Sequence, residues 1–429
     1  MTSTTNELTS PRIEALRRSV DSGAVGAVEE FWREVVECGT PLVEPLPDDV
    51  KDMLVTFVWR GSEATRNVVV LGAIATPGIP AESQFACLAG TDVWHRTYRL
   101  PADLRTTYRM AENDSLEPLR GLKGPNAFAE RTAGWRPAPL NRTPFPPVEA
   151  STSGLALPAA PPQPWIEVRP DVPYGECASQ PFASAILGNE RRAIVYTPPG
   201  YDAQRAAPYH LVVLFDAGAY TSSVPTPTIL DNLLAAGRIA PMVGVFVGNP
   251  DQETRGRELP AHPPFVEFLA EELLPWVRQR YHVTTDPAQV VIGGSSYGGL
   301  AASHAALRRP DVFGNVLSQS GSYFWKPDGD EEWEWHARQY AAAEKLPLRF
   351  YLDVGRLEGR RNPNPDHDLN PGQVIANRHM RDVLRAKGYP VHYAEFTGAH
   401  DYICWRGTLA DGLLALVGTA QDQDSAASS

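Results

Sequence analysis

Ser296 has the local sequence that points most directly to chemistry. Residues 294–298 read GSSYG, which matches the pattern GxSxG. In this pattern a sharp turn from a strand to a helix holds the serine in a strained, exposed conformation, and the two glycines avoid collisions with the neighbouring helix. Residues 289–294 are apolar as in a strand, and residues 300–309 are Ala- and Leu-rich as in a helix. We therefore predict that Ser296 is a nucleophile.

A serine nucleophile needs a histidine as base, which follows the serine in chains of this kind. His400 lies in FTGAHDYICWR, directly after the apolar residues 391–396 and before a segment that can begin the final helix. A loop that follows the last strand is the expected position of the base. Four other histidines lie in or beside apolar or helical segments and are interpreted as packed or half-exposed side chains: His210, His282, His304 and His392. His400 is therefore the predicted base.

The acid that orients the histidine is expected at the end of the preceding strand, residues 348–354. Glu358 follows this strand at once and is the preferred candidate. Asp353 lies within the strand and is the alternative. Asp366 and Asp368 lie further along in RRNPNPDHDLNPG, which is predicted to be an exposed loop.

Acyl transfer also requires two backbone N–H groups directed at the developing oxyanion. One is expected at Tyr297, the residue after the nucleophile. The other is expected at Ala217, because residues 210–215 form an apolar strand and the small residues after it allow close approach to a substrate.

The composition of the 429-residue chain is that of a globular protein, with 43% hydrophobic residues and a formal net charge of −12. The negative charge disfavours general binding to nucleic acid or to anionic membranes. No run approaches the roughly 18 apolar residues of a membrane span, and no export signal is visible at the start. The four cysteines lack CxxC spacing, which favours free thiols. We therefore expect a cytoplasmic protein.

Proline divides the chain into two bodies. Residues 1–135 are predicted to form N-terminal helices, the first with Ser10 as N-cap, followed by a small β-sandwich. Residues 136–163 are predicted to be a proline-rich linker without regular structure. Residues 164–420 alternate strands and helices, which predicts an α/β domain with a mostly parallel sheet. Residues 421–429 are expected to form a disordered tail.

Several of these segments resemble the enterochelin (enterobactin) esterase family. The resemblance covers nearly the whole chain and includes RRAIVYTPPGYD, RGRELP, GGSSYGG, GAHDYICWR and the upstream FWREVVECGTPLVE. It implies an immunoglobulin-like sandwich followed by an α/β-hydrolase domain, with Ser296, Glu358 and His400 as the triad. The implied reaction is cytoplasmic hydrolysis of a catecholate trilactone siderophore. No cofactor or catalytic metal is implied, and iron enters only as part of the ferric siderophore.

A ferric catecholate is strongly anionic, so cationic and aromatic side chains are expected to bind it. Arg255 and Arg257 follow the strand at residues 243–248 and are expected at the substrate. Five further candidates are Trp94 and Arg96 in the first body and Trp325, Arg356 and Trp405 near the hydrolase loops.

Three other functions are compatible with the same sequence. One is a general carboxylesterase acting on feruloyl or acetyl groups, and another is a peptide or depsipeptide hydrolase. The third is a non-catalytic binding protein on a hydrolase fold.

Overall fold

The computed structural model describes residues 8–47, 49–75, 78–119, 122, 127–147, 150–359 and 370–419. The chain folds into two compact units. The first contains Met1–Pro161 together with Thr397–Ala399, and the second contains Pro162–Phe396 and His400–Ser429. The predicted disordered tail at 421–429 lies outside the described residues.

Two helices begin the first unit. Helix α1 spans Pro11–Asp21, and the hydroxyl of Ser10 accepts a hydrogen bond from the backbone N–H of Ile13, which confirms the predicted N-cap. Helix α2 spans Ala27–Cys38. The two helices bury one apolar cluster against the neighbouring strands and turn, made of Ile13, Leu16, Phe31, Trp32, Val35, Leu42, Val58, Leu88 and Val93.

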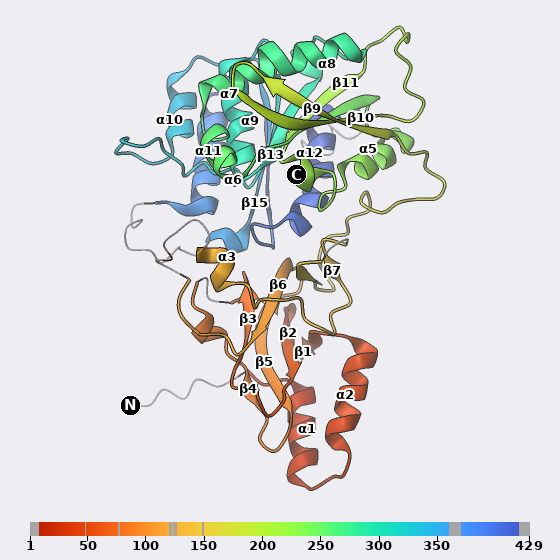
Figure 1. Cartoon of the computed structure of the whole chain (residues 1–429), viewed down its shortest axis with the longest axis vertical. Coiled ribbons are helices and arrows are strands. Elements are labelled where there is room, and N and C mark those ends of the chain that lie inside the picture. Colours follow the sequence, from red (N-terminus) through yellow and green to blue (C-terminus); the bar gives the residue numbers. More distant parts are fainter. Residues whose placement is uncertain are drawn as a thin grey trace. The chain divides into compact units, whose positions relative to one another are not determined.

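The rest of this unit is a sandwich of two antiparallel four-stranded sheets (Figure 1). The rings of Phe57 and Tyr108 meet edge to face at 4.8 Å and join the two sheets, and both side chains are buried. One sheet has the order β1 (Leu42–Leu46), β2 (Asp49–Arg60), β5 (Val93–Pro101), β4 (Ala86–Cys87). The other has the order β3 (Val68–Gly72), β6 (Arg105–Glu112), β8 (Thr152–Ala156), β7 (Pro144–Phe145). The short helices η1 (Pro80–Ser83) and α3 (Ala127–Arg131) lie in the connections.

The proline-rich stretch 136–163 differs from the predicted linker, because β7 and β8 lie within it. Strand β8 pairs with β6, so that Ser153 lies opposite Tyr108. Phe145 and Leu155 are buried in the unit. The prolines flank short apolar runs, and burial of those runs in the sandwich outweighs the low strand propensity of the stretch.

The second unit is built on one eight-stranded sheet of order β16-β15-β14-β13-β11-β12-β10-β9. The six strands β11 to β16 pair in parallel, whereas β10 is antiparallel to both of its neighbours, β9 and β12. Their bounds are β9 Glu176–Ser184, β10 Asn189–Thr197, β11 His210–Phe215, β12 Met242–Val247, β13 Val290–Ser295, β14 Asn315–Gln319, β15 Arg349–Gly355 and β16 Val391–Phe396. The predicted mostly parallel sheet is confirmed.

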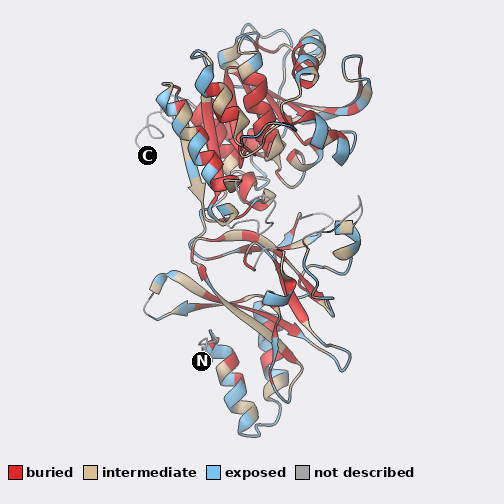
Figure 2. Ribbon diagram, turned by 90° about the vertical axis from the view of Figure 1, so that its left-hand side faces the viewer, coloured by how far each residue is buried: buried red, intermediate tan, exposed pale blue. Residues whose placement is uncertain are grey.

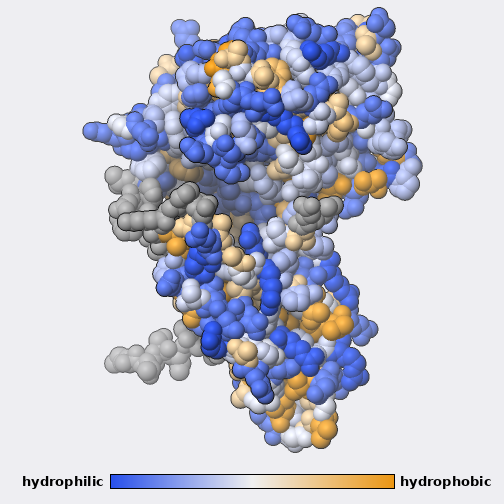
Figure 3. Space-filling view, viewed as in Figure 1, coloured by the Kyte–Doolittle hydropathy of each residue, from blue (hydrophilic) through white to orange (hydrophobic). Residues whose placement is uncertain are grey.

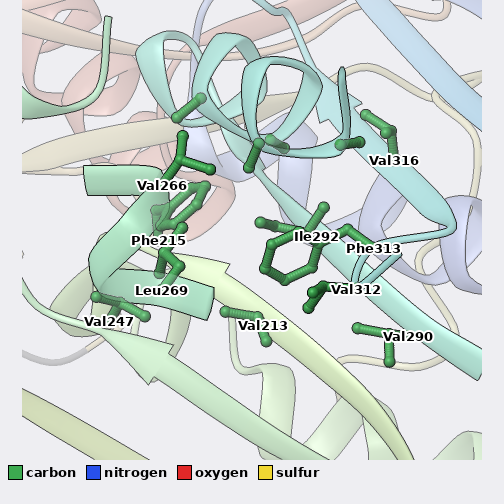
Figure 4. Packing of buried hydrophobic residues seen from close by; sticks show 14 of the residues in the cluster. Val213, Phe215, Val247, Val266, Leu269, Val290, Ile292, Val312, Phe313 and Val316 are labelled. Carbon is green, nitrogen blue, oxygen red and sulfur yellow. The ribbon is translucent and has the colours of Figure 1, made fainter. Parts of the chain in front are cut away.

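Helices cover both faces of this sheet because side chains of each strand point alternately to the two faces. Val213 and Ile292 belong to one buried cluster (Figure 4), and Val212 and Val291 belong to the other. The central strands are therefore buried on both sides (Figure 2). The first face carries α7 (Pro263–Glu267), η2 (Phe268–Leu273), α8 (Leu274–Arg280), α9 (Tyr297–Arg308), α10 (Trp335–Ala342) and α11 (Gly372–Ala386). The second face carries α5 (Thr226–Ala235) and α12 (Tyr402–Val417).

The carboxyl ends of the parallel strands carry the short elements that form the site. Helix α4 (Ala217–Tyr220) follows β11, α6 (Gln252–Glu258) follows β12, and η4 (Arg356–Gly359) follows β15. The short η3 (Pro287–Gln289) precedes β13 at the opposite edge.

The surface is hydrophilic over most of the second unit in the view of Figure 3. Hydrophobic residues gather over α1 and α2 of the first unit, where Val25 and Val36 are exposed. Within the described ranges, no helix combines the length and apolar character needed to cross a membrane.

Candidate active site

The turn at Ser296 has the geometry of a nucleophile elbow. Strand β13 ends at Ser295 and α9 begins at Tyr297, so the serine alone makes the turn. Its backbone has φ 59° and ψ −121°, a conformation that costs an L residue about 1–3 kcal/mol. The amide of Ser296 donates to the carbonyl of Gln319 at 2.9 Å, which ties the strained turn to the adjacent strand.

The glycines around the elbow do not contribute equally. A Cβ on Gly294 would lie 3.1 Å from the Cα of Gly298, so this position requires close approach to the helix. A Cβ on Gly298 would meet only ordinary contacts, the nearest being Phe215 at 3.6 Å. A Cβ on Gly299 would lie 2.4 Å from Ser318 Oγ. The prediction was therefore right for Gly294, but the second tight position is Gly299 rather than Gly298.

Glu358 and His400 form a direct pair. His400 Nδ1 lies 2.6 Å from Glu358 Oε2, and the Glu358 side chain is only 4% exposed whereas that of His400 is 42% exposed. The other carboxylate oxygen, Oε1, accepts from the backbone amide of Gly355 and the hydroxyl of Ser320, both at 2.7 Å. The carboxylate is thus held by three donors, while the imidazole remains partly open to solvent.

Trp405 lies beneath the imidazole. Its ring meets that of His400 edge to face at 4.8 Å, and its indole N–H donates to Ser320 Oγ at 3.0 Å. The side chain is 3% exposed. Trp405, predicted as a substrate contact, therefore has no free face for a catechol ring, because its ring is packed in the core and supports His400.

The hydroxyl of Ser296 makes its hydrogen bond with Ser322, Oγ to Oγ at 3.2 Å. In the part of the chain that the structure describes, the Ser296 hydroxyl forms no hydrogen bond with His400. Catalytic hydrogen bonds are often long in a free enzyme and shorten when substrate binds. Ser296 and Glu358 nevertheless contact the same end of strand β14. The amide of Ser296 donates to Gln319, and Glu358 accepts from the next residue, Ser320.

Asp353, the alternative acid, is fully buried inside the sheet and does not contact His400. Its Oδ1 accepts from the amide of Ser320 at 3.0 Å, and burial raises the pKa of Asp353 to about 7. Asp366 and Asp368 lie outside the described residues. Geometry therefore favours Glu358 as the partner of the histidine.

The two predicted oxyanion donors are the first residues of helices α4 and α9. Ala217 is buried and follows Asp216, whose backbone is left-handed at φ 56° and ψ 53°. Tyr297 follows Ser296. The first N–H groups of a helix have no partner inside that helix, so the amides of Ala217 and Tyr297 have no intrahelical acceptor.

The two predicted cationic contacts differ in their surroundings. The guanidinium of Arg255 forms a bidentate pair with Asp216, with Nε to Oδ1 and Nη2 to Oδ2 both at 2.7 Å, and its side chain is 17% exposed. Arg257 is exposed, and among the described residues it forms no hydrogen bond or ion pair. Arg255 is thus already committed to a carboxylate, whereas Arg257 keeps its charge for another partner.

Trp94 and Arg96 lie on β5 of the first unit and make contacts within it. A Cβ on Gly61 would lie 2.4 Å from Trp94 Nε1, so this ring is packed against the backbone. Arg96 donates to the carbonyls of Glu82 and Gln84 and lies over the Tyr98 ring at 5.5 Å. These contacts explain both side chains without a ligand.

Trp325 and Arg356 lie in the second unit. Trp325 is half-buried, and its ring lies 6.2 Å from Trp335 and 6.0 Å from His336. Arg356 is exposed, and its charge contributes to the lowered pKa of Glu395, which is set mainly by a hydrogen bond from Arg378.

Three side chains that contact the candidate site were not identified from the sequence: Asp216, Ser320 and Ser322. Ser320 and Ser322 follow β14, which neighbours the nucleophile strand β13, and small polar residues at such a strand end are a signal that points to a site. Ser320 also has φ 46°, a strained conformation. In the described part of the chain, no three His, Cys, Asp or Glu side chains come together as metal ligands would.

Two family models match the chain. Residues 54–166 match the N-terminal domain of enterochelin esterases, and residues 184–416 match a putative esterase family. The iron(III) enterobactin esterase of Dickeya dadantii is 31% identical, and the match covers 93% of this chain and 94% of that protein. The iron(III) salmochelin esterase of Escherichia coli O6:H1 is 29% identical, over 95% of this chain and 98% of that protein.

Solved structures of enterobactin esterases are also similar to this chain. The enterobactin esterase of Shigella flexneri, crystallised in the presence of enterobactin, superposes with a TM-score of 0.72 at 28% identity, covering 92% of this chain and 98% of that chain. The ferric enterobactin esterase of Salmonella typhimurium gives a TM-score of 0.73 at 27% identity, covering 90% and 98%. Because both halves of the chain and the combined fold match, the protein belongs to the enterochelin esterase family.

Proposed function

We propose that this protein is a serine esterase that hydrolyses the ester bonds of a catecholate trilactone siderophore of the enterobactin type, allowing release of its iron. The observation that supports the chemistry best is the 2.6 Å hydrogen bond between His400 and Glu358 in the unit that also holds the strained elbow at Ser296. The substrate class is supported by the relatives, which are named as iron(III) enterobactin and salmochelin esterases.

In the first half-reaction, the imidazole of His400 takes the proton of the Ser296 hydroxyl through Nε2. The serine oxygen then attacks a lactone carbonyl, and the amides of Tyr297 and Ala217 donate to the resulting oxyanion. Collapse of the tetrahedral intermediate breaks the C–O bond. The imidazolium gives its proton to the leaving seryl oxygen of the substrate, and the acyl group remains bonded to Ser296 as an acyl-enzyme.

In the second half-reaction, water attacks the acyl-enzyme while His400 takes a proton from it. The second tetrahedral intermediate collapses with release of the carboxylic acid, and Ser296 regains its proton from the imidazolium. Glu358 stays hydrogen-bonded to His400 Nδ1 throughout. It holds Nδ1 protonated, so that Nε2 is the nitrogen that faces the reaction, and it stabilises the imidazolium.

Iron is part of the substrate in this proposal. A trilactone ring preorganises three catechols around one ion, and opening the ring removes that preorganisation and weakens the hold on iron. Arg257 is the proposed cationic contact, because its exposed guanidinium is available to an anionic substrate. Trp325 and Arg356 remain proposed contacts, whereas Trp94 and Arg96 already have partners within the first unit.

All of the proposed catalytic side chains belong to the unit of Pro162–Phe396 and His400–Ser429, which we propose as the catalytic domain. We place the reaction in the cytoplasm. All four cysteines, Cys38, Cys87, Cys177 and Cys404, are free thiols, and three of them are exposed. Exposed free thiols are characteristic of a reducing compartment.

The test is a product assay with purified protein, using enterobactin, bacillibactin and a feruloyl ester, each with and without Fe(III). We expect linear and then monomeric catechol-serine products from enterobactin, identified by mass. Ser296→Ala is expected to lower turnover by about 10³-fold or more while substrate binding is retained. Preferred hydrolysis of the feruloyl ester would identify a general carboxylesterase instead, and full activity of Ser296→Ala would exclude the serine mechanism.

A further inference from the structure

The pair formed by Arg255 and Asp216 lies directly before a proposed oxyanion donor. Asp216 is the single residue between the end of β11 at Phe215 and the start of α4 at Ala217. Both carboxylate oxygens are occupied: Oδ1 accepts from Asn249 and from Arg255 Nε, and Oδ2 accepts from Arg255 Nη2, all at 2.7 Å. Asp216 is only 8% exposed, so these charge-assisted bonds are shielded from water.

This pair holds a backbone conformation that is unfavourable by itself. A left-handed backbone is unfavourable for an L residue, and Asp216 adopts it at φ 56° and ψ 53°. The φ and ψ angles of Asp216 set the direction of the next peptide plane, and therefore of the Ala217 N–H. Three hydrogen bonds to the side chain keep Asp216 in this conformation and so fix the direction of that amide.

Arg255 itself comes from a helix that is anchored at a second point. On α6, Arg255 and Glu258 are three positions apart and share one face. Glu258 forms a buried ion pair with Arg191 of β10 at 2.8 Å, and it also accepts from Asn189 at 2.8 Å. Helix α6 therefore presents Arg255 from a rigid support, whereas Arg257 points away from these contacts and is exposed.

We propose that Arg255 is a positioning residue, which acts through Asp216 to direct the Ala217 amide at the oxyanion. The inference rests on the proposed serine esterase function and deepens it. The bidentate geometry matters because a guanidinium fork fixes the rotation of a carboxylate, which a point charge does not. Arg255 thereby contributes to the reaction of every ester, charged or neutral, while Arg257 contributes only to an anionic substrate.

The experiment compares Arg255→Met, Arg255→Lys and the matched control Arg257→Met with the unmodified protein. Two quantities are measured: kcat and KM for ferric enterobactin, and the rate at which a neutral alkyl fluorophosphonate labels Ser296. The phosphonyl oxygen occupies the oxyanion position, so the labelling rate reports on the oxyanion donors without a charged substrate. Thermal unfolding is followed for each variant.

For Arg255→Met we expect kcat and the labelling rate to fall together by about 10-fold to 100-fold, with KM nearly unchanged. Arg255→Lys is expected to show most of the same loss. Arg257→Met is expected to raise KM for the anionic siderophore and to leave the labelling rate unchanged. Asp216→Asn combined with Arg255→Met should lose no more than Arg255→Met alone, because the two residues act as one unit.

A normal labelling rate in Arg255→Met would overturn the inference, since it would reduce Arg255 to a substrate contact. If Arg255→Met does not fold, Arg255→Lys decides in the same way, and a normal labelling rate in that variant overturns the inference. Failure of the underlying function gives a different result. In that case the unmodified protein is not labelled, or labelling persists in Ser296→Ala.

Discussion

His400 and Glu358 are joined by a 2.6 Å hydrogen bond although they are 42 positions apart in the chain. Glu358 is held by Gly355 and Ser320, so the carboxylate has a single orientation before any substrate arrives. In the proposed mechanism, Glu358 determines which imidazole nitrogen carries a proton.

We expect Glu358→Gln to lower kcat by about 10²-fold to 10⁴-fold, because an amide keeps the shape of the side chain but cannot stabilise the imidazolium. The measurement is steady-state hydrolysis at neutral pH. Asp353→Asn is the matched control, since Asp353 is buried nearby but does not contact His400. A large loss in Asp353→Asn together with an active Glu358→Gln would transfer the acid role to Asp353.

Ser320→Ala should reduce stability as well as activity. Its hydroxyl donates to Glu358 and accepts from the indole N–H of Trp405, which is buried. An unpaired buried donor costs about 1–3 kcal/mol, so the free energy of unfolding is expected to fall by that amount. Urea denaturation checks this result, with Ser22→Ala as the exposed serine control. Equal stability of Ser320→Ala and Ser22→Ala would show that the indole N–H is satisfied elsewhere.

Gly298 and Gly299 should respond differently to alanine. A methyl group on Gly299 would meet Ser318 Oγ at 2.4 Å, the Cα of Gly321 at 3.1 Å and the carbonyl of Gly294 at 3.2 Å. Overpacking of this kind costs about 1–3 kcal/mol, whereas Gly298→Ala gains helix propensity of up to about 1 kcal/mol. Chemical denaturation of both variants measures the difference. A Gly298→Ala variant less stable than Gly299→Ala would contradict the contacts of the elbow.

Stability should also depend on pH through His304, which is buried beside His336 with their rings 5.4 Å apart. Burial lowers the pKa of His304 to about 4, and the charge of Arg308 adds to this. The unfolded chain therefore binds a proton that the folded protein excludes, and stability falls as the pH drops from about 6.5 toward 4. The contribution of His304 is about 3 kcal/mol over this interval.

The measurement compares the unfolding free energy of the unmodified protein and of His304→Leu between pH 4 and pH 7. Only the difference between the two proteins isolates His304. Burial raises the pKa of Asp353 to about 7 and that of Asp411 to about 6, so these two carboxyls make both proteins more stable as the pH falls. We expect the unmodified protein to lose more stability in acid than His304→Leu. Parallel pH profiles would show that His304 takes up its proton without unfolding.

Local sequence was sufficient for the elements around the predicted nucleophile. The run QVVIGG at residues 289–294 predicts a buried strand and the following alanines predict a helix, and both are present around Ser296. Ser10 was identified as an N-cap in the same way. These features depend on hydrophobic period, glycine positions and capping, all of which act over a few residues.

Tertiary structure alone decided the partners of charged and aromatic side chains. Arg255 was expected at the substrate, but the fold brings it to Asp216, and Trp405 was expected on a catechol, but the fold buries it under His400. The stretch around Leu155 was expected to be a linker, but it pairs as a strand. Burial and ion pairing join residues distant in sequence, and no local pattern encodes which distant carboxylate or sheet edge will be adjacent.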